Sequence, residues 1–371
     1  KMDRITERIK DCLKDVPEYV AGKSIEEVKQ KYRLNRVVKL ASNENPYGAS
    51  KKAIKAFREF GDFHIYPKTD FVELREKIAE YVEVNADRIV LGAGMDGVLE
   101  NIFKMFLNAG DEVIISIPSF PYYHTLTKIH CAKDVQVNRG EDFTMNVDAV
   151  LDKTNEKTKI IIVCSPNNPT GNVESREDIK RLIEETDALV FIDEAYVEFS
   201  DNDLMDLVDY ENIVVARTFS KAFALANLRI GYAVMHEDLR KEYMKVSTPF
   251  PLSTSAVNAA IAALDDLEYT KRCIKLIVEE RERLMKELSK FFKVYPSQAN
   301  FLFVKSGVKA KTIAEELMKR GVIVRDCSNF IGCDEYSLRI SVGRKEDNDF
   351  LLEALDDLKA CLLYTSPSPR D

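Results

Sequence analysis

Five short apolar runs, rich in valine and isoleucine, constrain the fold of this chain more than any other feature. They cover residues 88–91, 113–116, 160–163, 189–192 and 213–216. Nearly continuous apolar runs of this length are typical of strands buried on both faces of a mostly parallel sheet. The segments between them, such as 97–108 and 175–186, have helical patterns, and an acidic turn at 174–178 favours a helix start. This alternation predicts an α/β fold with helices on both faces of a central sheet.

The pattern changes after about residue 253, which predicts a smaller α+β domain. The expected elements are a broken helical stretch at 253–291, strands at 300–304, 322–324 and 337–340, and helices at 309–320 and 346–362. We expect an N-terminal segment, residues 1–44, to pack with this small domain of residues 253–361, beside a large domain of residues 45–252. Residues 362–371 lack helical or strand patterning, so we interpret them as a disordered or non-native tail.

Composition excludes several classes of protein. The net charge of −8 over 371 residues argues against a general nucleic-acid binder. The seven cysteines form no CxxC pair, and their odd number fits reduced thiols in a cytosolic enzyme. The four histidines show no metal-ligand spacing. No apolar stretch approaches the ~20 residues that span a bilayer, and the charged start has no signal-peptide core. We therefore expect a cytoplasmic protein without metal, membrane or nucleic-acid partners.

Polar loops follow these runs, and functional groups collect on such loops in open parallel sheets. The glycine-rich loop 92–97 could bind an anion through backbone N–H groups at a helix start. The loop 117–123 could supply a ring that stacks on a flat cofactor, although packing alone also explains an aromatic there. Two prolines and a glycine in 165–171 can hold an asparagine amide rigidly. Asp193, three residues before Tyr196, could pair with a cationic ring nitrogen or could cap a helix.

Lys221 follows the last apolar run, next to Ser220, and Arg229 lies eight positions later. An amine near apolar walls and other cations loses its proton readily and can form a Schiff base with an aldehyde. A single lysine is more often a solvated surface residue. The order of the surrounding motifs decides between these interpretations.

That order resembles the fold-type I pyridoxal-phosphate (PLP) aminotransferases over residues 15–361. The shared features are a glycine loop, an aromatic residue, Asn-Pro-Thr-Gly, Asp-x-x-Tyr, Ser-Lys and an arginine eight residues on. The finer pattern is similar to the histidinol-phosphate aminotransferase family, in residues 17–24, 40–48, 66–67, 193–199, 218–232 and 338–343. The resemblance implies a PLP-dependent transaminase that exchanges the amino group of L-histidinol phosphate with 2-oxoglutarate in histidine biosynthesis. The products would be imidazole acetol phosphate and L-glutamate.

The resemblance also implies a set of roles. Lys221 would form the Schiff base and move the proton, and Asp193 would keep the pyridine nitrogen protonated. Tyr196 and Asn168 would hold the phenolic oxygen, with Tyr196 counted among the catalytic residues, and Phe120 would stack on the ring. The phosphate would be bound by Met95, Asp96, Thr218, Ser220 and Arg229.

Substrate contacts and a second subunit are implied in the same way. Arg339 would bind a substrate phosphate or carboxylate with both arms of its guanidinium. The further substrate contacts implied are Tyr19, Asn43 and Arg325. Tyr66 would reach the phosphate of the neighbouring subunit, which makes a homodimer part of the site.

Two departures from the family pattern leave alternatives open. Gly97 stands where an acid is common, and the segment 248–255 has Pro251 and Ser253 but lacks the usual asparagine. The second departure lies where substrate and subunits are expected to meet. The alternatives are an aromatic amino-acid transaminase, a PLP-dependent decarboxylase of threonine phosphate, and a non-catalytic ligand-sensing protein with this fold.

Overall fold

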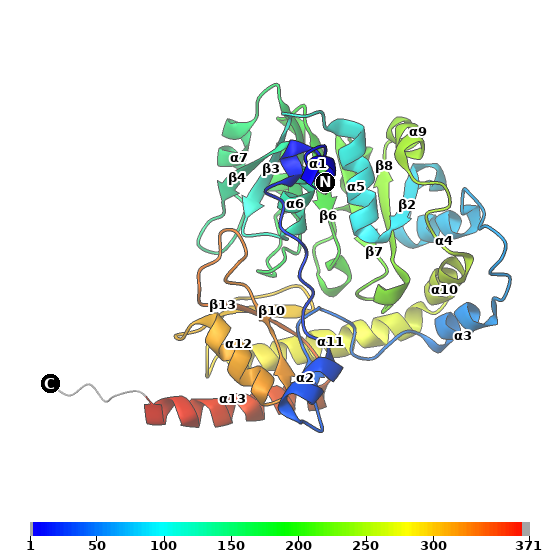
Figure 1. The fold of residues 1–371 in the computed structure, drawn as a ribbon. Helices are drawn as coiled ribbons and strands as arrows, with labels where there is room; N and C mark the ends of the chain where they lie inside the picture. Colours follow the sequence, from blue (N-terminus) through cyan, green and yellow to red (C-terminus); the bar gives the residue numbers. More distant parts are fainter. Residues whose placement is uncertain (1–2, 366–371) are drawn as a thin grey trace.

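The computed structural model describes residues 3–365 and has a large and a small domain (Figure 1). A seven-stranded sheet forms the centre of the large domain. In spatial order its strands are β2 (Ile89–Ala93), β8 (Ile230–Met235), β7 (Ile213–Thr218), β6 (Leu189–Asp193), β5 (Thr158–Cys164), β3 (Glu112–Ile117) and β4 (Lys133–Asn138). All five apolar runs are strands of this sheet, so the α/β prediction is confirmed.

Both faces of the sheet are buried, because alternate residues of each strand enter different cores. One face is covered by α5 (Gly94–Phe106), α6 (Tyr122–Ile129) and α9 (Glu237–Val246). The other face is covered by α3 (Lys51–Glu59), α4 (Val72–Val82), α7 (Val147–Lys153), α8 (Arg176–Glu184) and α10 (Thr254–Leu264). The apolar runs are continuous because neither side of the sheet meets water.

Strand direction places the chemical groups. Strands β3 to β7 are parallel, so their carboxyl ends lie at one edge of the sheet. Asp193 ends β6, and Lys221 lies in the loop just after β7. Strand β8 is antiparallel to both β2 and β7 and brings Arg229, directly before it, back to the same edge.

The small domain lies below the large one in Figure 1. Its antiparallel sheet has the order β12 (Arg325–Asp326), β13 (Ser337–Ser341), β10 (Phe301–Lys305) and β9 (Lys293–Val294), and a separate parallel pair joins β1 (Val38–Lys39) to β11 (Val322–Ile323). Its helices are α2 (Ile25–Tyr32), α11 (Leu267–Leu288), α12 (Ala310–Lys319) and α13 (Lys345–Thr365). Within residues 3–365 the 3₁₀ turns are Asp11–Leu13, Ala86–Arg88, Val197–Phe199, Met205–Asp209 and Ala226–Leu228.

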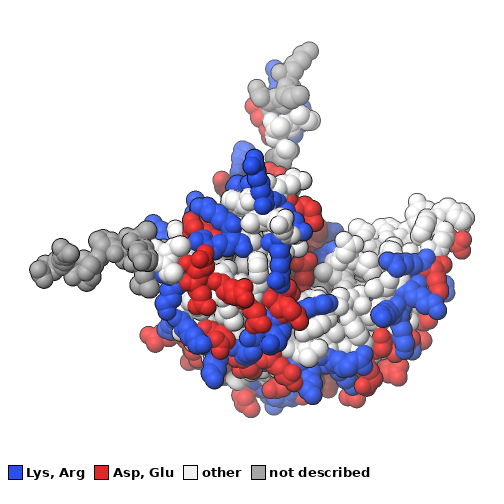
Figure 2. All heavy atoms as spheres, turned by 90° about the horizontal axis from the view of Figure 1, so that it is seen from below, with Lys and Arg blue, Asp and Glu red and all other residues white. Residues whose placement is uncertain are grey.

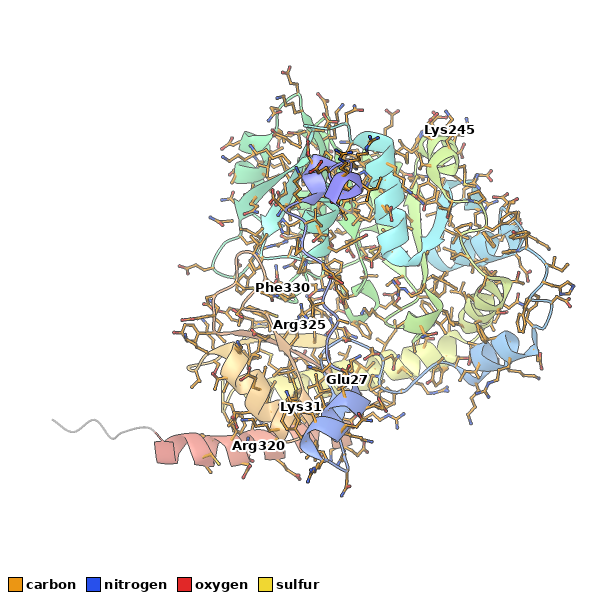
Figure 3. The ribbon with its side chains drawn as sticks, in the orientation of Figure 1. Glu27, Lys31, Lys245, Arg320, Arg325 and Phe330 are labelled. Carbon is orange, nitrogen blue, oxygen red and sulfur yellow. A yellow bond between two sulfur atoms is a disulfide. The ribbon has the colours of Figure 1, made fainter. Side chains whose placement is uncertain are left out.

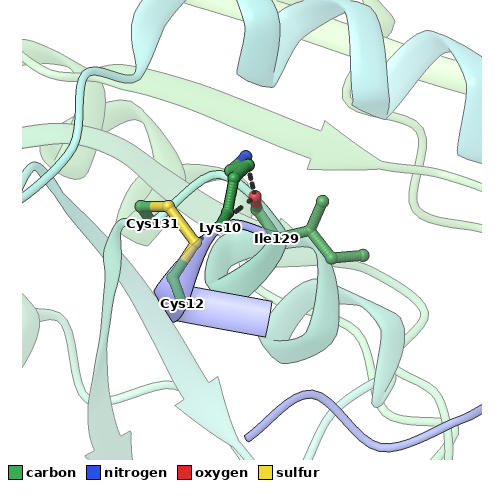
Figure 4. The surroundings of a disulfide bond; sticks show 4 residues. All are labelled: Lys10, Cys12, Ile129 and Cys131. Carbon is green, nitrogen blue, oxygen red and sulfur yellow. Dashed lines mark hydrogen bonds between the residues drawn. A yellow bond between two sulfur atoms is a disulfide. The ribbon is translucent and has the colours of Figure 1, made fainter. Parts of the chain in front are cut away.

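The N-terminal segment spans both domains. Helix α2 and strand β1 lie in the small domain, whereas α1 (Asp3–Thr6) lies beside α6 of the large domain, with the chain running between them in Figure 1. A disulfide joins Cys12 to Cys131, just beyond α6, and Lys10 Nζ donates to Ile129 O at 2.7 Å (Figure 4). The expectation of reduced thiols is therefore wrong for these two cysteines, because a pairing across 119 residues leaves no local pattern.

Helix α13 continues to Thr365, so the first four residues of the expected tail are helical. The remainder of that tail lies outside the described residues. Within residues 3–365, no helix is long and apolar enough to cross a membrane.

Candidate active site

Asp193 is buried at the end of β6, with both carboxylate oxygens engaged. Oδ1 accepts from Ala195 N at 3.0 Å, and Oδ2 accepts from the Tyr123 hydroxyl. Burial raises the pKa of Asp193 to about 6, while these two hydrogen bonds oppose the rise. Asp193 is therefore mostly ionised at neutral pH and can hold a cationic partner.

The Lys221 side chain is half-buried, and its amine forms no ion pair with a carboxylate of residues 3–365. Its Nζ donates to Ser42 O at 3.0 Å and lies 5.7 Å from the centroid of the Tyr196 ring. Burial, followed by the charges of Arg339 and Arg229, lowers the pKa of Lys221 to about 8. A substantial fraction of the amine is neutral near pH 7–8, as a nucleophile requires.

Two hydrogen bonds between side chains at this edge join the large domain to other parts of the chain. Asn43 Nδ2 donates to Tyr196 Oη at 3.1 Å, which leaves the Tyr196 O–H available as a donor. Arg339 Nη1 donates to Asn168 Oδ1 at 2.7 Å, which leaves the Asn168 amide N–H groups as donors. Asn43 is fixed by Ser341, which donates from Oγ to Asn43 Oδ1 at 2.7 Å.

Hydroxyls, an arginine and a helix start form one corner suited to an anion. Thr218 Oγ1 donates to Ser220 Oγ at 3.0 Å, and Arg229 Nη1 lies 3.4 Å from the same oxygen. Met95 and Asp96 lie in the first turn of α5, where backbone N–H groups lack helical partners. Gly94 has a φ of +74°, and a Cβ added there would lie 2.6 Å from Arg229 Nη2. Glycine there permits the close approach of the arginine to the helix start.

The expected substrate residues lie on the small-domain side. Arg339 is only 7% exposed, donates from Nη2 to Ala41 O at 2.7 Å, and its buried Nε has no partner among the described residues. Arg325 pairs with Arg339 in register across β12 and β13, and its guanidinium lies 5.3 Å from the Phe330 ring (Figure 3). Tyr19 is exposed but close enough to influence the pKa of Arg339.

Phe120 and Tyr66 have different settings. Phe120 lies in the loop after β3 and packs edge-to-face on Tyr123 with ring centroids 5.5 Å apart. Tyr66 is 78% exposed and stacks on Phe250 at 4.7 Å, within the unusual segment 248–255. Of the expected cofactor residues, Tyr66 and Arg229 are the two that are exposed in this single subunit.

Sequence reasoning missed the residues that support the site. Tyr123 bonds Asp193, and Ser42 supplies the carbonyl for Lys221. Beneath the Asn168 loop, Asn167 Oδ1 accepts from Arg139 Nη2 at 3.1 Å, and Arg139 forms a buried 2.7 Å pair with Glu174. Glu174 was taken for part of an acidic helix turn, but it is buried and Ser175 caps α8.

The residues present fit a planar aldehyde cofactor that carries a phosphate. A half-buried low-pKa amine, a buried carboxylate, two donors on Asn168 and Tyr196, and the anion corner all lie at one edge of the sheet. The orphaned Nε of Arg339 provides a further donor toward an anionic group. No cluster of three metal-binding side chains occurs within residues 3–365.

Comparisons with known proteins agree with this geometry. The family model described as aminotransferase class I and II matches residues 35–355. Histidinol-phosphate aminotransferase 1 of Archaeoglobus fulgidus is 57% identical over 325 residues, which cover 88% of this chain and all of that protein. The histidinol-phosphate aminotransferase of Methanosarcina mazei is 46% identical over 360 residues, covering 95% of this chain and 97% of that protein.

A solved structure is similar over almost the whole chain. The histidinol-phosphate aminotransferase of Sinorhizobium meliloti, in complex with pyridoxal-5'-phosphate, has a TM-score of 0.87 and 26% identity. The match covers 96% of this chain and 98% of that one.

Proposed function

The chain belongs to the aminotransferase class I and II family, and on that premise we propose that it is a PLP-dependent histidinol-phosphate transaminase. It would transfer the amino group of L-histidinol phosphate to 2-oxoglutarate in histidine biosynthesis, and this rests on the identity of its relatives. The observation that best supports this substrate is the buried Arg339. Its Nε has no hydrogen-bond partner among the described residues, and Arg325 lies opposite it on the neighbouring strand.

PLP supplies an aldehyde for the amine and a protonated ring that accepts electrons from the substrate α-carbon. The residues that would hold it are Asp193 at the ring nitrogen, Asn168 and Tyr196 at the phenolic oxygen, and Phe120 at the ring face. The phosphate would lie in the corner of Thr218, Ser220, Arg229 and the first turn of α5.

Lys221 is the proton carrier in this proposal. Its burial and the nearby arginine charges lower the pKa of the amine to about 8, so the neutral form that accepts a proton is well populated. The Ser42 carbonyl at 3.0 Å orients Nζ, and the Tyr196 ring closes one side against water. These contacts hold the amine at the sheet edge where the substrate would bind.

Arg339 and Arg325 are the proposed anion-binding pair. Two guanidinium groups on neighbouring strands repel each other unless an anion lies between or beside them. The phosphate of one substrate and a carboxylate of the other can both supply that anion. Tyr19 and Asn43 are the proposed companions, Tyr19 from the exposed N-terminal segment and Asn43 through its bond to Tyr196.

We also propose a homodimer. The exposed apolar residues Phe63, Ile65, Tyr66 and Phe250 gather beside α3, and a groove lined by Phe60, Phe63 and Ser253 adjoins them. In Figure 2 charged side chains cover most of the face, but an uncharged band lies on the right, the side on which Figure 1 places α3. A second copy packed on this band would bring the Tyr66 of one subunit to the proposed phosphate-binding corner of the other subunit.

A cytoplasmic location is proposed from the biosynthetic relatives. The disulfide is compatible with it because intracellular disulfides persist in some hyperthermophilic organisms. Cell fractionation tests this: recovery of the protein outside the cytoplasmic fraction would contradict it.

The cofactor part is tested by absorbance. Purified protein mixed with PLP should gain a visible band, which Lys221→Ala should lose. A wild-type protein that stays colourless would exclude the assignment. The substrate part is tested by adding histidinol phosphate, phenylalanine, tyrosine or threonine phosphate alone and following loss of that band in one turnover. Release of carbon dioxide from threonine phosphate would instead support a decarboxylase.

A further inference from the structure

We propose that Tyr123 is a positioning residue for the PLP reaction: its phenol holds Asp193 ionised and correctly oriented toward the ring nitrogen of the cofactor. The proposal rests on the cofactor assigned above, but it does not depend on which amine is the substrate.

The contact joins two fully enclosed groups. Tyr123 has 0% exposure, Asp193 has 6%, and the Tyr123 hydroxyl donates to Asp193 Oδ2. Burial by itself favours the neutral acid, which could not hold a protonated ring nitrogen. The donors that oppose burial are Tyr123 on one oxygen and Ala195 N, at 3.0 Å, on the other. Of these two donors, only Tyr123 donates from its side chain, so only this hydrogen bond can be removed by a substitution.

The tyrosine is held rigidly. It lies in the first turn of α6, and its backbone carbonyl accepts from Thr127 Oγ1 at 2.7 Å. Helix α6 is fixed to β4 by His124 and Asp134, 2.8 Å apart, and to the N-terminal segment by the disulfide just beyond its end. Phe120 packs edge-to-face on the Tyr123 ring. One short segment therefore sets both the residue expected to stack on the cofactor and the donor behind Asp193.

Tyr123 also remains a donor over the working range. Burial and the Asp193 carboxylate raise the pKa of Tyr123 well above its ordinary value, so the phenol keeps its proton. A tyrosine that merely needed a partner could bond any buried acceptor, and loss of its hydroxyl would then affect stability alone.

The test compares Tyr123→Phe, Tyr123→His and Tyr243→Phe with wild type. Tyr243 is a matched control because it is also fully buried, and its hydroxyl bonds Leu91 O at 2.8 Å and Asn101 at 3.0 Å, not Asp193. For each protein the PLP dissociation constant, kcat and KM are measured, and PLP labelled with ¹⁵N reports protonation of its ring nitrogen by NMR. Thermal melts of the PLP-free proteins report stability.

Loss of a hydrogen bond to a charged group should weaken PLP binding about tenfold or more in Tyr123→Phe. The ¹⁵N signal should move toward the value of an unprotonated pyridine, and kcat should fall about tenfold while KM changes less than about threefold. Tyr123→His, which keeps a donor, should recover part of the affinity and of the ¹⁵N signal. Tyr243→Phe should lose stability but keep the wild-type PLP affinity and ¹⁵N signal.

Wild-type affinity and ¹⁵N signal in Tyr123→Phe would overturn the proposal, and so would equal losses in Tyr123→Phe and Tyr243→Phe. A wild-type protein that binds no PLP would remove the cofactor assignment and this proposal together. If wild type binds PLP but does not react with histidinol phosphate, the substrate proposal fails, while the ¹⁵N and affinity results still support or overturn the role of Tyr123.

Discussion

Arg339 Nη1 donates to Asn168 Oδ1 at 2.7 Å, across 171 residues of sequence. The bond joins strand β13 of the small domain to the loop after β5 of the large domain. Asn168 is an expected cofactor contact and Arg339 an expected substrate contact. If Arg339 binds the substrate, this hydrogen bond would couple substrate binding to the residue proposed to hold the phenolic oxygen of the cofactor.

Arg339→Lys should raise KM for the amino donor and lower kcat/KM by about 10- to 100-fold, because lysine cannot make the forked, charged hydrogen bonds of arginine. PLP affinity should fall by less than kcat/KM, because Arg339 would act on PLP only through Asn168. Steady-state kinetics with wild type and variant measure both effects. Arg320→Lys is the control, since Arg320 bonds Asp357 on the outer surface of the small domain (Figure 3). Equal losses in both variants would argue against a substrate role for Arg339.

Asp193→Asn should stabilise the PLP-free protein at pH 8 and abolish tight PLP binding. The pKa of Asp193 is raised to about 6 in the folded state, so the folded state holds the proton more tightly than the unfolded state. This contribution to stability is fully present below about pH 4 and is lost as the pH rises through 6. The amide of Asp193→Asn does not ionise, so the variant should have a free energy of unfolding about 1–3 kcal/mol higher than wild type at pH 8.

Glu194→Gln, one residue later, is the matched control for Asp193→Asn. Glu194 forms a buried 3.0 Å pair with Arg217, so its removal leaves a buried cation short of a partner. We expect this variant to lose stability. Urea unfolding of both variants at pH 4 and pH 8 measures the difference. A pH-independent effect of Asp193→Asn would contradict the argument.

The sequence predicted site residues that belong to local motifs, but it did not predict contacts between residues far apart in the chain. Asp193, Lys221 and Asn168 follow apolar runs whose parallel direction carries them to one edge, so local patterns placed them. Strand β8 was not predicted, although its antiparallel course places Arg229. The partners of these residues were also missed, because the Asn43–Tyr196 bond spans 153 residues and the Tyr123–Asp193 bond spans 70. Such pairings follow from the packing of whole elements and leave no trace in a motif.

The disulfide should give the protein two fewer reactive thiols than its seven cysteines when it is denatured without reductant. Cys12→Ser should lower the free energy of unfolding by about 3–5 kcal/mol, the range for opening a loop of this length. A reductant should destabilise wild type similarly and leave Cys12→Ser unaffected. Seven reactive thiols in the denatured, unreduced protein would show that the bond does not form.

Placing two carboxylates on the uncharged band should separate the subunits. Phe63 and Ile65 are 77% and 60% exposed, and the double change Phe63→Glu with Ile65→Glu would bury charge in the proposed interface. Sedimentation velocity should show a dimer for wild type and a monomer for the variant. PLP affinity should fall as well, because Tyr66 would no longer reach the partner's site.

Val308→Glu is the control for the dimer experiment, since Val308 is an exposed apolar residue of the small domain. It should leave both mass and PLP affinity unchanged. Tyr66→Phe should weaken PLP binding without separating the subunits. A dimer that survives the double change, or unaltered PLP affinity in Tyr66→Phe, would count against a shared site.

The central claim is that this chain transaminates histidinol phosphate, and the most direct test is the ratio of kcat/KM for histidinol phosphate and for phenylalanine, each with 2-oxoglutarate. The anion-binding pair Arg339 and Arg325 predicts that histidinol phosphate is preferred by at least about tenfold, equivalent to about 1.4 kcal/mol in transition-state binding. A tenfold preference for phenylalanine would contradict the account and assign the chain to aromatic amino acids.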